Sequence, residues 1–266
     1  MPKAEALDSK ITIYSFPKVT QMSNSNVEKP NNAEEWERQY LSTPKAIIEL
    51  QHPVAQLMAE LTDKGDVLLE TGCGSAQVSA ELASVGRKIE LADFSQKILD
   101  QAAEVFHLSK LPEPALKCCD LTVFPWTWPD LAVDVSWSAG VLEHWTDEEI
   151  MPMFAEMARI SRKQVVSLVP YANSLFYRLG KDYAERSGTW PYGREIPRHT
   201  LRHVFEAAGL TDIQEWDILA EHSLVFLDMI DPKFREIASN WWNSLEPNDP
   251  AKIGQGYALV TVGKKK

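Results

Sequence analysis

Short apolar runs alternate with segments of helical periodicity through the middle of the chain, and this alternation restricts the fold more than any other feature. One helical segment has Val78, Leu82 and Val85 on a common face. Alternating strands and helices form crossover connections, which place parallel strands in one sheet. We therefore predict an α/β fold with a doubly wound, mostly parallel sheet. The expected strands are 67–69, 88–93, 115–119, 131–138, 164–169, 211–219 and 257–262.

Segments outside this alternation define the expected domain organisation. Residues 1–32 are polar and interrupted by prolines, which predicts a flexible N-terminal arm. Residues 33–266 form one domain, with insertions at about 171–197 and 221–250 where the alternation breaks. Residues 43–62 have helical periodicity, and Pro53 is expected to kink or divide that helix. Thr146 and Glu149 have capping-box spacing, although Pro152 is a possible restart of their helix.

Composition indicates a folded protein of a reducing compartment. Hydrophobic residues make up 44% of the chain, too many for a disordered protein. The three cysteines show no zinc-ligand spacing, so we expect neither disulfides nor a metal site. No signal peptide or membrane span is visible, and we expect a cytoplasmic protein without a membrane partner. A net charge of −11 makes nucleic acid an unfavourable partner.

The first predicted strand leads into a turn that contains two glycines, with the sequence E-T-G-C-G-S-A over residues 70–76. Gly72 and Gly74 allow the backbone to bend and leave space for a ligand. A dinucleotide fingerprint requires a third glycine, at the position that Gln77 occupies here. The pattern is also compatible with a tight strand-to-helix turn that binds nothing.

Asp93 ends the second predicted strand, about 20 residues after the glycines. A carboxylate at this point can accept hydrogen bonds from the two hydroxyls of a ribose. The alternative is an acid that stabilises the start of the next helix. Together the glycine turn and Asp93 favour a ligand site. Asp120 ends the third strand, where it can either accept from an exocyclic amine or simply form a turn.

The fourth strand and its continuation complete a resemblance. The segments LLETGCGSA, LADFS, CCDLTVFPW and DVSWSAGVLEHW occur in this order. The sequence resembles the class I S-adenosylmethionine-dependent methyltransferases, in their small-molecule branch, over residues 45–170 and 198–263. Two departures are Ala76, which replaces a third glycine, and residues 161–164, which lack the usual glycine.

The resemblance implies a seven-stranded Rossmann-like sheet with an antiparallel last strand, and S-adenosylmethionine bound at the carboxyl ends of the strands. It implies that Asp93 holds the ribose while Phe94 packs by the adenine. The residues it implies for the cofactor are Glu70, Gly72, Cys73, Gly74, Asp93, Phe94, Asp120, Leu121, Ser138, Ala139 and Gly140.

Methyl transfer requires alignment more than acid–base chemistry, because the sulfonium group is already activated. A base is needed only for a protonated nucleophile. His144 is the first candidate, and Glu143 the second. His144 can equally stabilise a loop or bind the cofactor carboxylate, and Glu143 can be a solvated acid at a helix start.

Aromatic residues suggest where the methyl acceptor binds. Trp145, Tyr171, Tyr177 and Tyr192 are the predicted acceptor-binding residues, since aromatic faces hold flat or cationic groups. The alternative for each ring, and for the tryptophans at 126, 128, 137 and 190, is packing in the core. Nearby arginines are candidates for a substrate carboxylate or for solvent: Arg178, Arg186, Arg194 and Arg198.

Four functions follow from these features. The first is transfer of a methyl group from S-adenosylmethionine to oxygen, nitrogen or sulfur of a small molecule. The others are a cofactor-binding interaction module without turnover, an NAD-type oxidoreductase, and a nucleic-acid methyltransferase. Gln77 disfavours the oxidoreductase. The sequence S-A-G after the fourth strand disfavours amino methylation of DNA.

Overall fold

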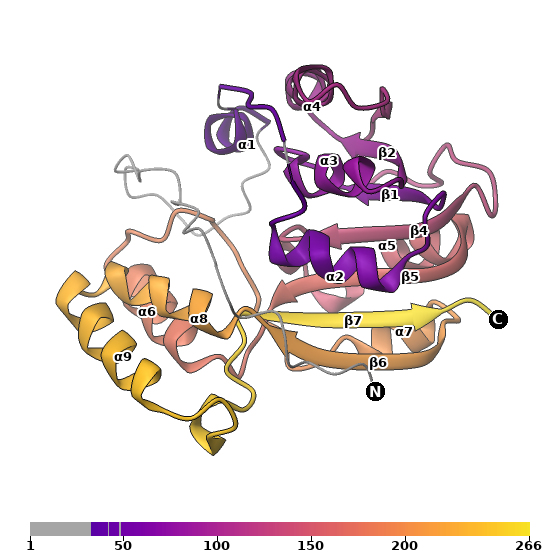
Figure 1. Ribbon diagram of the computed structural model, residues 1–266. Helices are drawn as coiled ribbons and strands as arrows, with labels where there is room; N and C mark the ends of the chain where they lie inside the picture. The colour runs from indigo at the N-terminus through magenta and orange to yellow at the C-terminus, as the bar shows by residue number, and fades with distance from the viewer. Residues whose placement is uncertain (1–32, 42, 48) are drawn as a thin grey trace. The chain divides into compact units, whose positions relative to one another are not determined.

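The computed structural model describes residues 33–41, 43–47 and 49–266 (Figure 1). Its strands form the expected seven-stranded sheet, in the order β3-β2-β1-β4-β5-β7-β6. The strands are β1 (Val67–Thr71), β2 (Lys88–Asp93), β3 (Ala115–Cys118), β4 (Val133–Ala139), β5 (Ser161–Pro170), β6 (Thr211–Ile218) and β7 (Ala258–Lys264). The arm predicted at residues 1–32 lies outside the described residues.

Strand directions confirm the predicted fold class. β1 pairs in parallel with β2 and β4, and β2 pairs in parallel with β3. The last strand, β7, runs antiparallel to both β5 and β6. The predicted strands are observed with shifted bounds: β4 begins at Val133, and β5 begins already at Ser161. No helix within the described residues is long and apolar enough to span a membrane.

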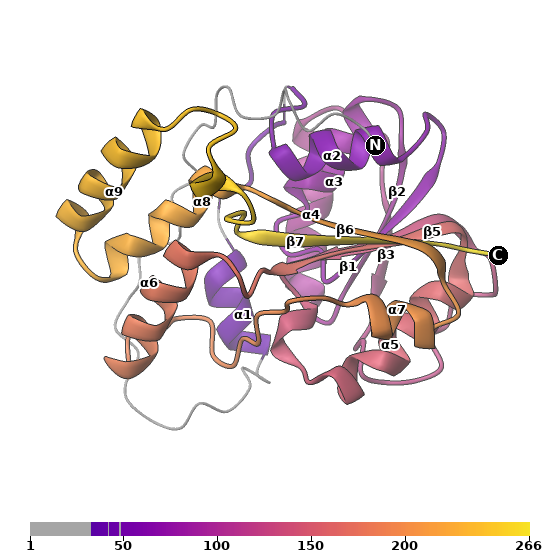
Figure 2. The same ribbon diagram turned by 90° about the horizontal axis from the view of Figure 1, so that it is seen from below.

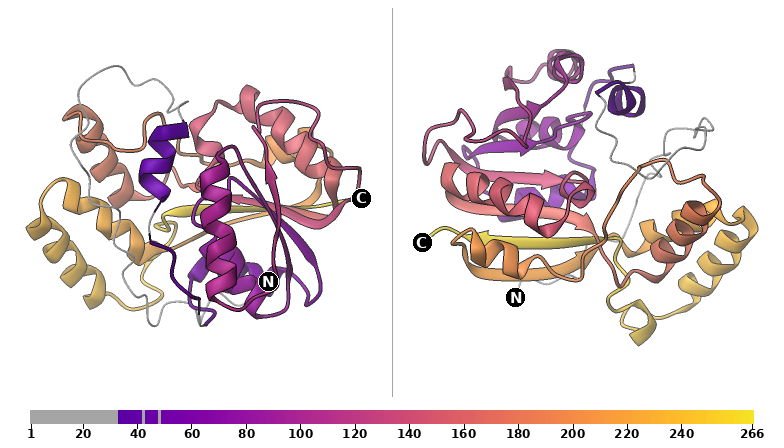
Figure 3. Two further views of the ribbon diagram at one scale, coloured as in Figure 1. Left: turned by 90° about the horizontal axis from the view of Figure 1, so that it is seen from above. Right: turned by 180° about the vertical axis from the view of Figure 1, so that it is seen from behind.

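The chain divides into two compact units, of which one comprises residues 33–137. Its strand β1 is apolar and buried, as Leu68 and Leu69 are fully inaccessible, which is typical of a parallel strand covered on both faces. Its helices are α1 (Ala33–Tyr40), α2 (Pro53–Leu61), α3 (Gln77–Ser84) and α4 (Gln96–Leu108). α1 lies beside α4 (Figure 3).

The helix predicted over residues 43–62 is wrong in its first half, because α2 begins only at Pro53. Proline disfavours helical geometry in the residue before it and is favourable at the first helical position. His52 is the N-cap, and its Nδ1 accepts from the N–H of Val54 over 3.2 Å. The N–H groups of Gln51 and His52 donate to Glu81 instead, over 2.8 and 2.7 Å. These contacts leave residues 49–52 outside the helix.

The other unit comprises residues 138–266. Helix α5 (Asp147–Ile160) has the predicted capping box at Thr146 and Glu149, but it continues through Pro152 without the suggested restart. Phe154 of α5 packs on Phe205 of α7, with ring centroids 4.8 Å apart. The remaining helices are η1 (Leu142–His144), α6 (Leu175–Arg186), α7 (Arg202–Ala207), α8 (Ala220–Ser223), η2 (Leu224–Met229), α9 (Pro232–Ser244) and η3 (Pro250–Lys252).

The two segments predicted as insertions contribute helices that pack on one another (Figure 2). α6 contacts η2, and η2 contacts α9. A Cβ atom on Gly180 of α6 would lie 2.1 Å from the carbonyl oxygen of Phe226, so only glycine allows this approach. Phe176 and Trp242 form a buried core between these helices.

Candidate functional site

The turn between β1 and α3 is fixed against the end of β2. Gly72, Gly74 and Ala76 have positive φ angles of 72°, 49° and 52°, a region that glycine enters readily. The N–H groups of Gly72 and Cys73 donate to the carbonyl oxygen of Ala92, over 2.8 and 3.1 Å. Both glycines that the sequence singles out therefore lie where the chain turns sharply after β1.

Asp93 joins this glycine turn to the beginning of α4. Its Oδ2 accepts from the N–H of Gly74 over 3.2 Å, and its Oδ1 accepts from the N–H of Ser95 over 3.0 Å. The side chain is 4% exposed, and this burial raises the pKa of the carboxyl group. A carboxylate has about four acceptor positions, so each oxygen can accept further hydrogen bonds.

Glu70 and Cys73 lie on either side of the start of the turn, and both are buried. The Glu70 Oε2 accepts from the Ser79 hydroxyl over 2.6 Å, which links β1 to α3. Burial raises the pKa of Glu70 to about 8, and the neighbouring charge of Asp93 adds to the shift. Burial likewise raises the pKa of the Cys73 thiol. Glu70 and Cys73 are therefore shielded from water where the turn begins.

Helix α1 covers the glycine turn, which the sequence did not predict. A Cβ atom on Gly74 would lie 3.1 Å from the ring of Tyr40. Glu37 accepts from the Ser95 hydroxyl over 2.7 Å and pairs with Lys97 over 2.8 Å. These contacts join α1 to the first turn of α4. Residues 33–40 have no motif that distinguishes this role from that of any exposed helix.

The end of β3 is a turn that Asp120 stabilises. Asp120 is exposed, and its Oδ1 accepts from both the N–H and the hydroxyl of Thr122, over 2.9 and 2.7 Å. This is the turn alternative that the sequence left open. Leu121 is buried, whereas Phe94 is 40% exposed. Trp126 is buried and donates to the Leu121 carbonyl over 3.2 Å, so its role is packing.

The end of β4 provides a small, partly unsatisfied surface. The Ser138 hydroxyl is buried and has no hydrogen-bond partner among the described residues. Gly140 has a φ angle of 70°, and its N–H donates to the Leu168 carbonyl over 3.1 Å. A Cβ atom added there would meet only Glu143 Oε1, at 3.7 Å. Ser138, Ala139 and Gly140 thus present little side-chain volume.

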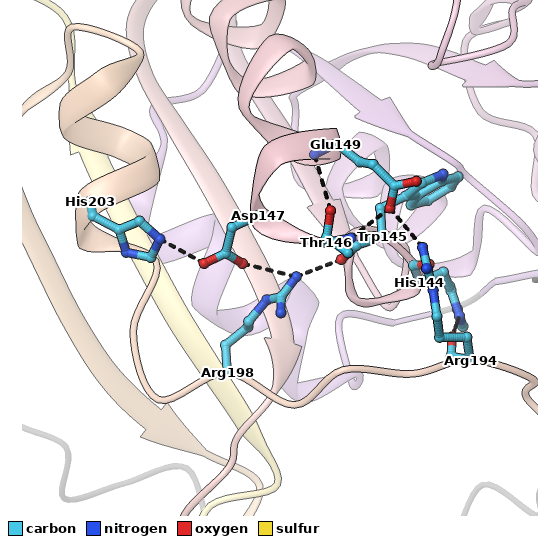
Figure 4. A network of polar contacts seen from close by, with 8 residues as sticks. All are labelled: His144, Trp145, Thr146, Asp147, Glu149, Arg194, Arg198 and His203. Atoms are coloured by element: carbon cyan, nitrogen blue, oxygen red, sulfur yellow. Dashed lines mark hydrogen bonds and ion pairs between the residues drawn. The ribbon is translucent and has the colours of Figure 1, made fainter.

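Two segments of the unit formed by residues 138–266 are joined by polar contacts (Figure 4). Arg194 donates through Nε to the His144 carbonyl over 2.9 Å and pairs with Glu149 over 2.7 Å. Arg198 pairs with Asp147 over 3.1 Å and also donates to the Trp145 carbonyl. Two of the arginines considered for a substrate carboxylate are therefore engaged within the protein.

The remaining members of this network fix Asp147 and the start of α5. His203 Nε2 lies 2.7 Å from the second oxygen of Asp147, so this carboxylate links α7 to Arg198. Thr146 and Glu149 complete their capping box in the same loop. The loop that follows β4 is consequently held by contacts on both sides (Figure 4).

His144 is held as a neutral imidazole. Its Nδ1 lies 2.7 Å from the Arg194 carbonyl, which identifies Nδ1 as the protonated nitrogen. Burial lowers the pKa of His144 to about 4. Its Nε2 lies 3.9 Å from Glu143 Oε1. An imidazole with so low a pKa is a weak base near neutral pH, so this geometry favours a positioning role.

Glu143 and Glu195 form a buried pair of acids. They are 3% and 8% exposed, and the Glu143 carbonyl accepts from the N–H of Ile196 over 2.8 Å. Burial raises the pKa of Glu195 to about 7 and that of Glu143 well above its usual value. The Tyr177 hydroxyl donates to Glu195. Glu195 lacked any sequence signal, since its partners lie 18 and 52 positions away.

The predicted acceptor-binding aromatics lie in different environments. Tyr177 is fully buried, and its ring packs on Phe226 and Tyr257 with centroid distances of 5.0 and 5.3 Å. Tyr192 lies 5.2 Å from the Trp190 ring. Tyr171 follows β5 and accepts from the Asn173 amide over 2.8 Å. Trp145 is half-buried and makes an edge contact with His144.

Comparisons with known proteins agree with this arrangement. Residues 68–164 match the family model described as a methyltransferase domain. This stretch begins in the strand before the glycine turn and ends within β5, so it includes Asp93 and the end of β4. Residues 68–164 are therefore similar to a methyltransferase domain, in agreement with the predicted resemblance, and solved structures share the fold. No curated protein matches the sequence.

Solved structures share the fold at low sequence identity. Magnesium protoporphyrin IX methyltransferase from Synechocystis PCC 6803, with bound SAH, is 16% identical with a TM-score of 0.53, covering 88% of this chain and 93% of that chain. A methyltransferase from Thermotoga maritima, described as a possible histamine N-methyltransferase, is 15% identical with a TM-score of 0.54, covering 80% and 87%. A SAM-dependent methyltransferase from Archaeoglobus fulgidus is 13% identical with a TM-score of 0.55, covering 80% and 93%.

Proposed function

We propose that this protein is an enzyme that methylates oxygen, nitrogen or sulfur of a small molecule with S-adenosylmethionine as the donor. The observation that carries this proposal is the Asp93 carboxylate, which is buried beside the turn at Gly72 and Gly74. A buried carboxylate with remaining acceptor capacity suits the vicinal hydroxyls of a ribose.

Other features of the structure fit the same cofactor. The Ser138 hydroxyl is buried without a partner among the described residues, and an unsatisfied buried group is expensive unless a ligand completes it. Gly140 leaves space next to it. When bound, S-adenosylmethionine supplies an activated methyl group on a positively charged sulfur. We assign its binding to Glu70, Gly72, Cys73, Gly74, Asp93, Phe94, Asp120, Leu121, Ser138, Ala139 and Gly140.

The chain's own tasks are then to orient the acceptor, exclude water and hold a proton. We propose that Trp145, Tyr171, Tyr177 and Tyr192 contribute to acceptor binding, with Tyr177 acting through Glu195. Glu143 is a candidate for the base when a bound cation stabilises its ionised form, because burial raises the pKa of its carboxyl group and so strengthens its carboxylate as a proton acceptor. His144 positions the loop through its bond to the Arg194 carbonyl.

The proposed acceptor is a small molecule for two reasons. The net charge of −11 disfavours a phosphate backbone. Two structural neighbours are described as acting on small molecules, a magnesium porphyrin and possibly histamine. We also propose a cytoplasmic location, because Cys73, Cys118 and Cys119 are all free thiols, as expected in a reducing compartment.

Calorimetric titration tests cofactor binding. We expect S-adenosylmethionine to bind and NAD to bind more weakly or not at all. The Asp93→Asn variant should lose at least ~1 kcal/mol of binding free energy, the lower range for a hydrogen bond to a charged group. Asp100→Asn, an exposed change in α4, is the matched control. Unchanged affinity in folded Asp93→Asn protein would refute the ribose role.

Turnover needs a separate measurement. Transfer of a labelled methyl group should be followed with phenols, amines, thiols and carboxylates as acceptors. Transfer to any of them supports the enzyme. Cofactor binding without transfer to any class would favour an interaction module that binds the cofactor without turnover.

A further inference from the structure

Glu143 carries an unsatisfied polar atom in the interior of the unit formed by residues 138–266. Its side chain is 3% exposed, and its Oε2 has no hydrogen-bond partner among the described residues. Such an atom costs the full desolvation of a carboxyl oxygen. The Nε1 atom of Trp190 is also buried and unsatisfied. Glu143 Oε2 and Trp190 Nε1 therefore both have unused hydrogen-bonding capacity in this part of the protein.

The cations around Glu143 have other partners. Arg198 pairs with Asp147 and donates to the Trp145 carbonyl. Lys181, only 4% exposed, is hydrogen-bonded to Glu185. His144, whose Nε2 lies 3.9 Å from Glu143 Oε1, is neutral because of its low pKa. The charge of Arg198 acts on Glu143 and lowers its pKa, but this guanidinium is shared with Asp147. Lys181 acts in the same way on the pKa of Glu195 and is shared with Glu185.

A second acid, Glu195, lies near Glu143, and the aromatic rings of Tyr177 and Trp190 lie near Glu195. The hydrogen bond from Ile196 to the Glu143 carbonyl brings the neighbouring Glu195 alongside. The Tyr177 hydroxyl donates to Glu195, and the Tyr177 ring lies 6.4 Å from the Trp190 ring. The Nζ atom of Lys181 lies 4.7 Å from the Trp190 ring centroid. This aromatic surface therefore already accommodates one ammonium group.

We propose that the Glu143 carboxylate binds the amino group of an amine acceptor, with Glu195 as a second negative group and aromatic rings beside them. This rests on the proposed function and narrows the acceptor to amines. We define the amine subsite as Glu143, Tyr177, Trp190 and Glu195.

Electrostatics distinguish an amine from the other acceptor classes. Burial raises the pKa of both carboxyl groups and favours their protonated form, whereas a bound ammonium group stabilises the ionised form. A carboxylate or phosphate would gain no such charge interaction, and an alcohol would gain only one hydrogen bond to Glu143 Oε2. An ammonium group gains both the hydrogen bond and the charge interaction. Charge complementarity therefore favours the amine.

The contact between Glu143 and the ammonium group also gives the ammonium proton an acceptor. An ammonium nitrogen has no lone pair, so it must lose a proton before it can act as a nucleophile. In this step an N–H bond breaks, an O–H bond forms on Glu143, and the nitrogen keeps the electron pair. Burial raises the pKa of Glu143, so its carboxyl group is able to hold that proton.

Matched ligands test the proposal with the full chain. Binding is measured by calorimetry, with S-adenosylmethionine present, for 2-phenylethylamine, 2-phenylethanol and 3-phenylpropanoate, and for tryptamine, tryptophol and indole-3-propanoate. We expect the amine of each series to bind best. Glu143→Gln should weaken amine binding about 10-fold, the loss expected for a charged hydrogen bond, and should remove the preference over the alcohol. Glu206→Gln, an exposed change in α7, should change neither the affinity for the amine nor the preference for the amine over the alcohol.

Titration of Glu143→Gln with S-adenosylmethionine alone separates this proposal from the broader one. If the cofactor binds normally but alcohols or acids bind as well as amines, or no amine binds, the amine subsite is refuted and the methyltransferase proposal stands. An undiminished amine preference in Glu143→Gln would also refute it. If wild-type protein does not bind the cofactor, the proposed function itself fails.

Discussion

At the scale of single residues, four buried acids have raised pKa values. Glu70, Asp93, Glu143 and Glu195 each lose water on folding, which raises their pKa values. Asp93 is partly compensated by N–H groups of Gly74 and Ser95, whereas Glu143 Oε2 has no partner among the described residues. Such positions reduce stability, and they are where a ligand with positive charge gains most.

The loss of stability caused by burying an acid can be tested at Glu70. Between pH 4.5 and about 8 the folded protein keeps a proton on Glu70 that the unfolded chain has released. The free energy of unfolding therefore falls as pH rises through this range, by up to ~1.4 kcal/mol per pH unit. Gln cannot ionise and can still accept from Ser79. We expect Glu70→Gln to gain stability relative to wild type as pH rises, reaching a few kcal/mol above pH 8.

Urea unfolding at pH 5, 7 and 8.5 measures this difference. Glu60→Gln, an exposed change in α2, should follow wild type at every pH. Parallel pH profiles for Glu70→Gln and wild type would show that Glu70 is ionised in the folded protein at neutral pH.

At the scale of elements, helix ends explain several features that periodicity alone did not predict. α2 begins at Pro53 because His52 caps it and Glu81 takes the preceding N–H groups. Its other end is closed by Arg87, whose Nη2 donates to the carbonyls of Ala59 and Thr62, both over 2.6 Å. The side chain that completes this helix thus comes from a different part of the chain.

Removing Arg87 should destabilise the unit that contains α2. Arg87→Met keeps much of the side-chain length but leaves the buried carbonyls without a donor. We expect a loss of ~3 kcal/mol, since these are charge-assisted hydrogen bonds to buried groups. Chemical denaturation followed by circular dichroism measures it. Lys88→Met, an exposed neighbour, is the control, and equal stability of the two variants would contradict the capping role.

At the scale of the whole molecule, the three free thiols differ in how far the fold protects them, and Cys73 lies within the glycine turn. Cys73 is buried, and its pKa is raised, whereas Cys118 is exposed. Reactivity requires both access and thiolate. The N–H groups of Gly72 and Cys73 both donate to the Ala92 carbonyl, so exposure of the Cys73 thiol is expected to require the loss of native contacts.

A variant in which Cys118 and Cys119 are serine isolates Cys73. We expect its single thiol to stay unreactive toward a disulfide reagent in native buffer and to react fully in urea. Bound S-adenosylmethionine should slow the reaction further if the turn is part of its site. Rapid labelling of native protein would mean that the turn opens without unfolding. Wild-type protein, in which Cys118 is exposed, should be labelled quickly.

Much of the fold could be predicted because it depends on local periodicity. The alternating strands and the Thr146 capping box were predicted from residues within a few positions of one another, and both are observed. The helix predicted at 43–62 was wrong only in its first half, where Glu81, about 30 residues away, accepts hydrogen bonds from the N–H groups of Gln51 and His52. Propensity is a weak prior against such tertiary contacts.

The sequence by itself determined the type of sheet, the glycine turn and the position of Asp93, because spacing along the chain specifies them. Only the tertiary structure decided that Tyr40 covers Gly74, that His144 is neutral, and that Glu195 lies beside Glu143. Burial and the pairing of distant side chains determine pKa values and unsatisfied atoms, and no local pattern encodes either.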